Sequence, residues 1–178
     1  MRVIAGEFRS RRLKSIPGLA TRPTPDRLRE TLFDILSPRI PGATFVDAYA
    51  GTGAVGIEAL SRGAGHAFFL ERHRGALTAI RENLAALGLD SRATVLPGAV
   101  LLNIPRAAGD IVFLDPPYEQ EREYGAALEL LSAMPPALVV VQHSVRQHLP
   151  ETSGKLRRTR AVKQGDNVLS FYEVAISD

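Results

Sequence analysis

A glycine-rich loop joins an apolar strand to a helix and is the clearest indication of the fold of this chain. It reads Asp47-Ala48-Tyr49-Ala50-Gly51-Thr52-Gly53-Ala54-Val55-Gly56. The spacing G-x-G-x-x-G permits a tight turn, close ligand approach and close packing of helix on strand. Glu71 follows Gly51 by twenty residues, at the end of the next apolar run, where a carboxylate can bind the ribose hydroxyls of a nucleotide cofactor. These features predict a nucleotide-binding strand-turn-helix.

Beyond this loop, short apolar runs alternate with segments of helical composition. The predicted strands are Thr44–Ala48, Ala67–Leu70, Ala93–Leu96, Ile111–Leu114 and Leu138–Val141, and the predicted helices are Ala54–Ser61, Arg74–Leu87 and Tyr124–Ala133. Such alternation is typical of βαβ units and a mostly parallel sheet. Two later runs, Leu156–Lys163 and Val168–Ile176, flank a four-residue turn and predict an antiparallel hairpin. The predicted class is therefore α/β, a Rossmann-like sheet of the methyltransferase type that ends in an antiparallel hairpin.

We divide the sequence into a basic N-terminal extension, residues 1–40, and a main domain, residues 41–178. Residues 2–14 alternate loosely and predict a small hairpin that turns near Gly6. Thr24 is a suitable N-cap, with Pro25 in the first helical position, for an amphipathic helix over Asp26–Leu36. On that helix Arg27 and Arg29 suit either a solvated face or a phosphate contact.

Composition excludes several classes of protein. At 178 residues with 45% hydrophobic residues, the chain suits one domain with a sizeable core. It has no cysteine, so disulfides and thiolate metal sites are excluded, and its histidines lack metal-ligand spacing. No apolar run approaches the roughly 18 residues that span a bilayer. The start of the chain lacks the apolar region of a signal peptide, so we expect a cytoplasmic protein without membrane partners.

Charge is distributed unevenly along the chain. Residues 1–40 carry a net charge of +5, residues 41–153 of −4 and residues 154–178 of +2, which gives +3 in total. Basic segments on both sides of an acidic middle favour a polyanionic partner, although solubilising surface charge explains them equally well.

The tetrapeptide Asp115-Pro116-Pro117-Tyr118 directly follows an apolar strand and indicates the chemistry. The carboxylate accepts N–H bonds, and the two prolines fix the backbone and remove two donors. The aromatic ring can stack on a flat base. Together these groups suit the binding of a planar amine, and they predict methyl transfer to the exocyclic nitrogen of a nucleobase.

Asp47 helps to distinguish S-adenosylmethionine from a nicotinamide dinucleotide as the cofactor. An acid before the glycines can bind the amino group of the methionine moiety, directly or through water, whereas it would repel a pyrophosphate. The Asp-Pro-Pro-Tyr motif points the same way, because a dehydrogenase does not need it.

With these motifs, the chain resembles the RsmD-type family of bacterial small-subunit ribosomal RNA guanine-N2 methyltransferases. The resemblance covers nearly the whole chain, and a segment ahead of the glycine loop makes it specific. The matching stretches are Arg2-Val3-Ile4-Ala5-Gly6, Arg22-Pro23-Thr24-Pro25-Asp26-Arg27-Leu28-Arg29-Glu30-Thr31-Leu32-Phe33, the glycine loop, Ala59-Leu60-Ser61-Arg62-Gly63-Ala64, Asp115-Pro116-Pro117-Tyr118 and Leu169-Ser170-Phe171-Tyr172.

The motifs and the resemblance together define the predicted site. The cofactor S-adenosyl-L-methionine is assigned to Thr24, Asp47, Tyr49, Gly51, Gly53, Glu71, Arg72 and Ala99. At Ala99 backbone groups would recognise the adenine, because the family often has Asp or Asn there and Pro97-Gly98-Ala99 offers no polar side chain. Asp115, Pro116, Pro117 and Tyr118 are the predicted catalytic residues. Small-subunit rRNA or the assembling subunit is the expected partner, and its predicted contacts are Arg9, Arg11, Arg12, Lys14, Arg22, Arg157, Arg158 and Arg160.

Three other interpretations remain open from the residues alone. DNA adenine-N6 and cytosine-N4 methyltransferases also use Asp-Pro-Pro-Tyr, but they usually carry a sizeable target-recognition region. A nicotinamide-dependent oxidoreductase shares the glycine loop. A non-enzymatic RNA-binding or assembly factor is disfavoured, because the acid-Pro-Pro-aromatic motif is intact.

Overall fold

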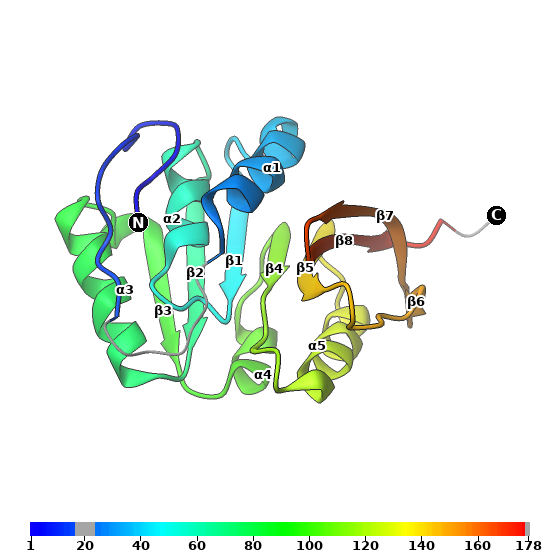
Figure 1. The fold of residues 1–178 in the computed structure, drawn as a ribbon. Helices are drawn as coiled ribbons and strands as arrows, with labels where there is room; N and C mark the ends of the chain where they lie inside the picture. Colours follow the sequence, from blue (N-terminus) through cyan, green and yellow to red (C-terminus); the bar gives the residue numbers. More distant parts are fainter. Residues whose placement is uncertain (17–23, 177–178) are drawn as a thin grey trace.

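An eight-stranded sheet forms the centre of the molecule, for which a computed structural model describes residues 1–16 and 24–176. The strand order is β3-β2-β1-β4-β5-β8-β7-β6 (Figure 1). The first five strands in that order are parallel, and β8, β7 and β6 continue the sheet in antiparallel fashion. The strands are β1 (Thr44–Ala48), β2 (His66–Glu71), β3 (Ala93–Pro97), β4 (Ile111–Leu114), β5 (Leu138–Ser144), β6 (Thr152–Ser153), β7 (Leu156–Gln164) and β8 (Asn167–Val174).

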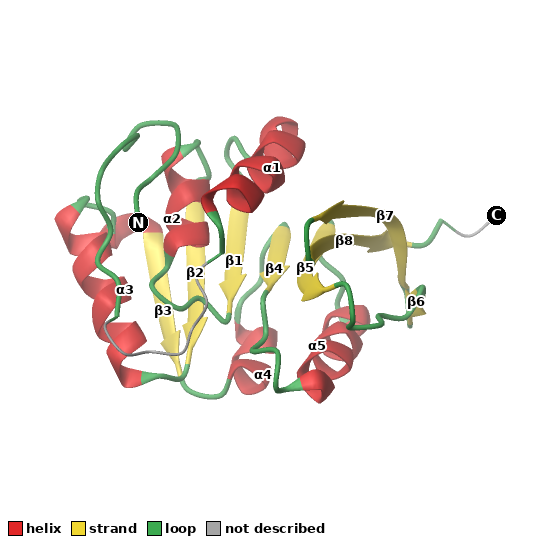
Figure 2. Cartoon of the chain, viewed as in Figure 1, coloured by secondary structure: helices red, strands yellow, loops and turns green. Residues whose placement is uncertain are grey.

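The helices, red in Figure 2, pack on both faces of the sheet. They are α1 (Asp26–Leu36), α2 (Ala54–Ser61), α3 (Arg74–Ala86), α4 (Val100–Asn103) and α5 (Glu121–Ala133), with 3₁₀ turns η1 (Ser37–Arg39), η2 (Asp90–Arg92) and η3 (Ile104–Arg106). No helix in the described ranges is both long and apolar enough to cross a membrane.

Alternate residues of each central strand pack on opposite faces of the sheet, as the period of two requires. Phe45 and Phe113 point to a core made with α1, α2 and α3, whereas Val46 and Val112 point to a second core made with α4 and α5. Because helices cover both faces, the central parallel strands are mostly apolar rather than alternating, and β4 is apolar throughout. The predicted α/β class and its closing antiparallel hairpin are confirmed. Helix α4 was not predicted, because four residues are too few to display a helical period.

The first fourteen residues are docked on helices α2 and α3. An antiparallel bridge joins Arg2 and Arg12, as the predicted hairpin required. The carboxylate of Glu58, wholly buried on α2, accepts hydrogen bonds from the backbone nitrogens of Ile4 (2.8 Å) and Ala5 (3.0 Å). Because these two donors and the acceptor leave water together, each compensates the desolvation of the others.

Two expectations for the start of α1 are wrong. The N-cap residue is Pro25 rather than Thr24, and the buried hydroxyl of Thr24 turns toward the carboxyl edge of the sheet. Arg29 is neither solvated nor available to a phosphate, since its side chain is fully buried. It donates to the carbonyl of Arg2 at 2.7 Å and to Asp26 at 3.0 Å, and burial lowers its pKa. Sequence periodicity could not predict this burial, because the carbonyl of Arg2 that accepts from Arg29 lies 27 residues earlier in the chain.

Candidate active site

A cavity of about 1100 Å³ opens at the carboxyl edge of the parallel strands. The chain leaves β1 toward β2 and β3 on one side, whereas β4 leads to β5 on the other, so the strand order reverses between β1 and β4. Ligands of open α/β sheets bind in the crevice at such a reversal. Within the described residues, the cavity wall comes from the loops after β1, β2, β3 and β4, the end of β5 and the N-terminal segment.

The glycines of the loop after β1 divide into two roles. Gly51 lines the cavity with a φ of +58°, and a Cβ atom added there would meet nothing within 4 Å, so its backbone faces open space. Gly53 and Gly56 instead pack against Phe69 of β2, where an added Cβ would lie 3.3 Å and 2.4 Å from the ring. Gly51 therefore admits a ligand, and the other two allow α2 to approach the sheet.

Glu71, at the end of β2, is buried and holds three backbone donors. Its Oε1 accepts from the nitrogen of Gly51 at 3.0 Å, and its Oε2 accepts from Arg72 at 2.8 Å and His73 at 3.1 Å. The carboxylate thus fixes the glycine loop to the turn after β2. A carboxylate offers about four acceptor positions, so one remains for a hydroxyl in the cavity.

Asp47, at the end of β1, is 1% exposed and still lines the cavity. Its Oδ2 accepts from the nitrogen of Gly56 at 2.9 Å, in the first turn of α2. Burial raises the pKa of the Asp47 carboxyl well above its usual range, and the nearby charges of Asp115 and Glu71 raise it further. A cation in the cavity would relieve both effects.

Tyr49 joins the glycine loop to the helix on the far side of the cavity. Its backbone lies in the left-handed region, with φ of +63°, and its hydroxyl donates to Glu123 of α5 at 2.5 Å. Burial, together with this carboxylate, raises the pKa of the Tyr49 phenol. A tyrosine in this conformation costs roughly 1 kcal/mol or more, and such strain often marks a ligand site.

The Asp-Pro-Pro-Tyr loop follows β4, the neighbour of β1, and all four of its residues line the cavity. The carbonyl of Pro116 accepts from the hydroxyl of Tyr124, a buried side chain of α5, at 3.3 Å. A carbonyl oxygen has two lone pairs, so this bond orients it and leaves one free. The ring of Tyr118 is 37% exposed, and its hydroxyl donates to Asn167 of β8 at 3.0 Å.

Thr24 and Gln142 complete the wall beside Asp115. Leu114 of β4 and Val141 of β5 are register partners, so Asp115, just after β4, and Gln142, within β5, lie side by side. Thr24 Oγ1 lies 3.4 Å from Asp115 Oδ2 and 3.3 Å from Gln142 Oε1, and its single hydrogen can serve one of them at a time.

A family model described as "Conserved hypothetical protein 95" matches residues 1–173. The chain belongs to this family. The resemblance to the RsmD-type family drawn from the motifs is confirmed, since "Ribosomal RNA small subunit methyltransferase D" of Escherichia coli K12 is 35% identical to it. That alignment covers 97% of this chain and 89% of the E. coli protein.

Solved structures show that the fold is shared with this family and beyond it. Hypothetical protein TTHA0928 of Thermus thermophilus is 33% identical, with a TM-score of 0.82 over 98% of this chain and 99% of that one. An RNA methyltransferase of Salinibacter ruber in complex with S-adenosyl-L-homocysteine is 14% identical, with a TM-score of 0.68 over 88% and 96% of the two chains. At that identity only the fold is comparable.

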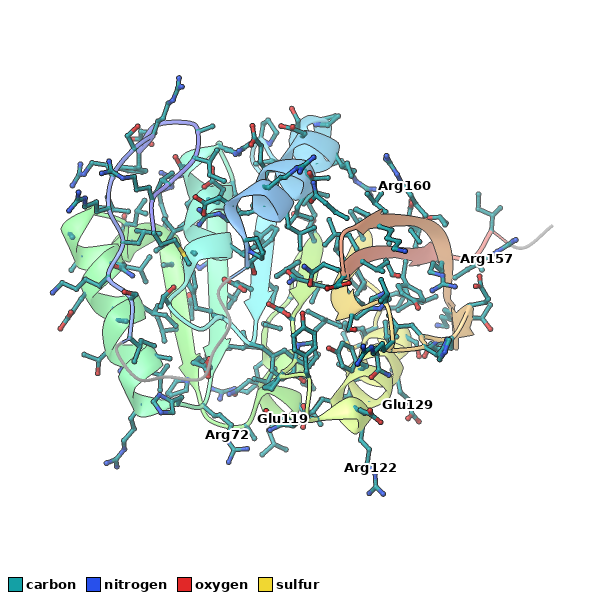
Figure 3. All side chains as sticks on the ribbon, viewed as in Figure 1. Arg72, Glu119, Arg122, Glu129, Arg157 and Arg160 are labelled. Carbon is teal, nitrogen blue, oxygen red and sulfur yellow. The ribbon has the colours of Figure 1, made fainter. Side chains whose placement is uncertain are left out.

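The remaining residues expected from the family motifs fall into three groups. Ala99 and Arg72 line the cavity with the residues already described, whereas Gly53 lies behind its wall. Arg22 lies outside the described residues. The basic residues lie elsewhere, with Arg157 and Arg160 on β7 and away from Arg72 and Glu119, which line the cavity (Figure 3).

Several basic side chains proposed for RNA already have protein partners. Lys14 pairs with Glu82 at 2.8 Å, Arg11 donates to the carbonyl of Ala86 at 3.3 Å, and Arg158 pairs with Glu151. The guanidinium of Arg160 lies 5.9 Å from the ring centre of Phe171. Except for the half-buried Arg158, all the described basic residues of this set are nevertheless exposed to solvent.

The sequence did not reveal four residues at or beside the cavity, namely Gln142, Glu123, Tyr124 and Asn167. A polar residue directly after the apolar run Leu138–Val141 was a usable signal for Gln142, by analogy with Asp115 after β4. The other three are ordinary helix or turn residues, and only their contacts place them near the site.

Proposed function

We propose that this protein transfers a methyl group from S-adenosyl-L-methionine to the exocyclic N2 of a guanine in small-subunit ribosomal RNA. One observation carries the proposal: Asp115-Pro116-Pro117-Tyr118 lines the same cavity as Asp47, Gly51 and Glu71. The ribosomal substrate is supported by family membership and by the name of the E. coli relative. Such a substrate would place the protein in the cytoplasm.

The residues of the cavity suit this cofactor. S-adenosylmethionine supplies an electrophilic methyl group on a positively charged sulfur and also carries an ammonium group. The charges of Asp115 and Glu71 are close enough to Asp47 to raise its pKa, so this acidic part of the cavity wall attracts cations. Asp47 would hold the ammonium group, Glu71 the ribose hydroxyls, and the open backbone at Gly51 the chain between them. The same carboxylates oppose the pyrophosphate of a nicotinamide dinucleotide.

Asp115 and Pro116 would act on the amine that receives the methyl group. The lone pair of guanine N2 is delocalised into the ring, so the nitrogen must become more tetrahedral to attack, and it gains positive charge as it does. The carboxylate of Asp115 would accept one N–H and stabilise that charge, and the free lone pair of the Pro116 carbonyl would accept the other N–H. As the bond between N2 and the methyl carbon forms, the bond between that carbon and sulfur would break, S-adenosylhomocysteine would leave, and the surplus proton of N2 would pass to water. Tyr118 would stack on the base and hold it in line, so that positioning supplies a large part of the rate.

The target base must leave its helix to reach this wall. A guanine stacked in RNA does not expose its amine to a cavity, so the nucleotide is splayed out or flipped. The basic N-terminal segment, rich in exposed arginine, would hold flanking phosphates.

Methylation of small subunits from cells that lack the protein tests the proposal. Purified protein and labelled S-adenosylmethionine are incubated with those subunits, with deproteinised rRNA and with duplex DNA, and modified nucleosides are identified by mass spectrometry. We expect N2-methylguanosine at one position of the small-subunit rRNA. Methyladenine or methylcytosine in DNA would support the rival amino-methyltransferase instead. Binding of NADH without binding of S-adenosylhomocysteine would indicate an oxidoreductase.

A further inference from the structure

The turn between β7 and β8 reaches the Asp-Pro-Pro-Tyr loop from a distant part of the chain. Tyr118 Oη donates to Asn167 Oδ1 at 3.0 Å, although the two residues are 49 positions apart. Asn167 is the first residue of β8 and pairs with Ser144, the last residue of β5. The antiparallel hairpin therefore ends at the same edge of the sheet as the substrate side of the cavity.

This turn is held from three sides, so it is a firm support. The backbone nitrogen of Val145 donates to the carbonyl of Asp166 at 3.0 Å, in the segment that follows β5. Gln164 and Asn167 are paired across the hairpin, which closes it with two intervening residues. On the far side, Thr31 Oγ1 of α1 lies 3.4 Å from Gln164 Oε1.

Tyr118 benefits from such a support because of where its ring lies. The side chain is more than one-third exposed and stands on a loop rather than on a helix or strand. A ring fixed only at its Cα end can pivot about two torsions, and its far end then sweeps the widest arc. A hydrogen bond at the hydroxyl restrains that far end, and the entropy of ordering the ring is lost before the base arrives.

We propose that Asn167 is a positioning residue, which holds the ring of Tyr118 as the stacking wall of the target-base subsite. Asn167, the first residue of β8, is then part of that subsite, although it lies outside every cofactor-binding motif. This inference rests on the proposed methylation of a base, and it adds a residue that acts on the base through Tyr118.

A double-mutant cycle tests the coupling. The four proteins are wild type, Tyr118→Phe, Asn167→Leu and the double variant, and the measurement is single-turnover methyl transfer to unmethylated small subunits. Each single change should lower the rate about fivefold, the scale of one neutral hydrogen bond, and the double variant should be no slower than either. Asn167→Asp keeps an acceptor and should stay near the wild-type rate, as should Asp166→Ala, which alters the exposed neighbour. Affinity for S-adenosylhomocysteine should be unchanged throughout.

A second readout does not depend on methyl transfer. Short single-stranded RNAs with one 2-aminopurine report stacking, because their fluorescence is quenched on an aromatic ring. We expect wild type to quench them and Asn167→Leu and Tyr118→Phe to quench them equally less. Losses that multiply in the double variant, or a wild-type rate and quenching in Asn167→Leu, would overturn the inference. Quenching lost in Asn167→Leu by a protein that methylates no RNA would keep the inference and reject the proposed function.

Discussion

At the scale of one residue, Asp47 is a buried carboxylate that suits a bound cation but lowers the stability of the ligand-free protein when it is charged. The carboxylate is buried beside two other acids, and its pKa is raised as a result. Its contribution to stability is most favourable below the pKa of the unfolded chain. It is lost as the pH rises from there to the raised pKa of the folded state, because only the unfolded chain ionises freely in that window.

Asp47→Asn should therefore raise the stability of the ligand-free protein at neutral pH and have little effect below the usual carboxyl range. The amide oxygen still accepts from the Gly56 nitrogen, so the loop should persist. Affinity for S-adenosylhomocysteine should fall by about 1.5–3 kcal/mol, the scale of a hydrogen bond to a charged group. Thermal melts across a pH series and calorimetry measure the two effects. Lower stability at neutral pH would show that the buried charge is better compensated than we infer.

Asp115→Asn tests the negative charge of the carboxylate that is proposed to accept an N–H bond from the substrate amine. The change preserves shape but removes the negative charge, so methyl transfer should fall by about 10²–10³-fold, as for loss of one preorganised electrostatic partner. Binding of S-adenosylhomocysteine should be nearly unchanged, because Asp115 is assigned to the substrate amine and the amide preserves the shape of the cavity wall. Single-turnover rates and calorimetry provide the comparison, and near-wild-type turnover would remove Asp115 from the proposed mechanism.

At the scale of elements, the N-terminal segment depends on one close approach to α2. Gly6 has φ of +88°, and a Cβ atom added there would lie 2.0 Å from the carbonyl oxygen of Ser61. The nitrogen of the next residue, Glu7, donates to that same carbonyl at 2.8 Å. A side chain at Gly6 would therefore have to break the docking of the segment rather than shift a flexible group.

Gly6→Ala and Gly42→Ala form a matched pair that isolates this contact. Gly42 also has a positive φ, of +76°, but an added Cβ there meets nothing within 4 Å. Gly42→Ala should cost about 1–2 kcal/mol from conformation alone, and Gly6→Ala about 1–3 kcal/mol more from the clash. Urea unfolding measures both. Equal losses would mean that the segment yields at no cost, and faster hydrogen exchange at Ile4 and Ala5 in Gly6→Ala would confirm its release.

At the scale of the whole molecule, basic groups lie at both ends and acids lie between them. The N-terminal segment packs beside α2 and α3, and β7 lies at the other end of the sheet (Figure 1). Arg157 is seven residues from Gln164 at the β7–β8 turn, which corresponds to roughly 23 Å along an extended strand. The two basic groups therefore lie on different parts of the molecule, and each would contact a different part of a large RNA.

Two multiple variants compare these surfaces. Replacement of Arg9, Arg11, Arg12 and Lys14 by alanine should weaken RNA binding most at low salt. The slope of log affinity against log salt should be flatter by about 0.7–0.9 for each phosphate that the variant no longer neutralises. Replacement of Arg157, Arg158 and Arg160 should have a smaller effect. RNA affinity across a salt series is the measurement, and S-adenosylhomocysteine binding is the control. A larger effect of the second variant would move the RNA surface to β7.

The features that could be predicted from the sequence are those that depend on residues close together in the chain. The parallel strands, the glycine loop with Asp47 and Glu71, and the motif at Asp115 follow from short-range spacing, because a strand end and a tight turn are fixed by a few neighbouring residues. The resemblance to a methyltransferase family rested on these same stretches.

The contacts between these features and distant side chains became visible only in the three-dimensional structure. It turned Thr24 from the expected helix cap to Asp115 and Gln142, buried Arg29 under the N-terminal segment, and joined Asn167 to Tyr118. Each of these contacts joins segments that are separated in the chain. Local interactions alone would allow each of these side chains another environment, such as a helix cap for Thr24 or solvent for Arg29. Packing decides among such alternatives, because a buried polar group must find its partner wherever the fold brings one within reach.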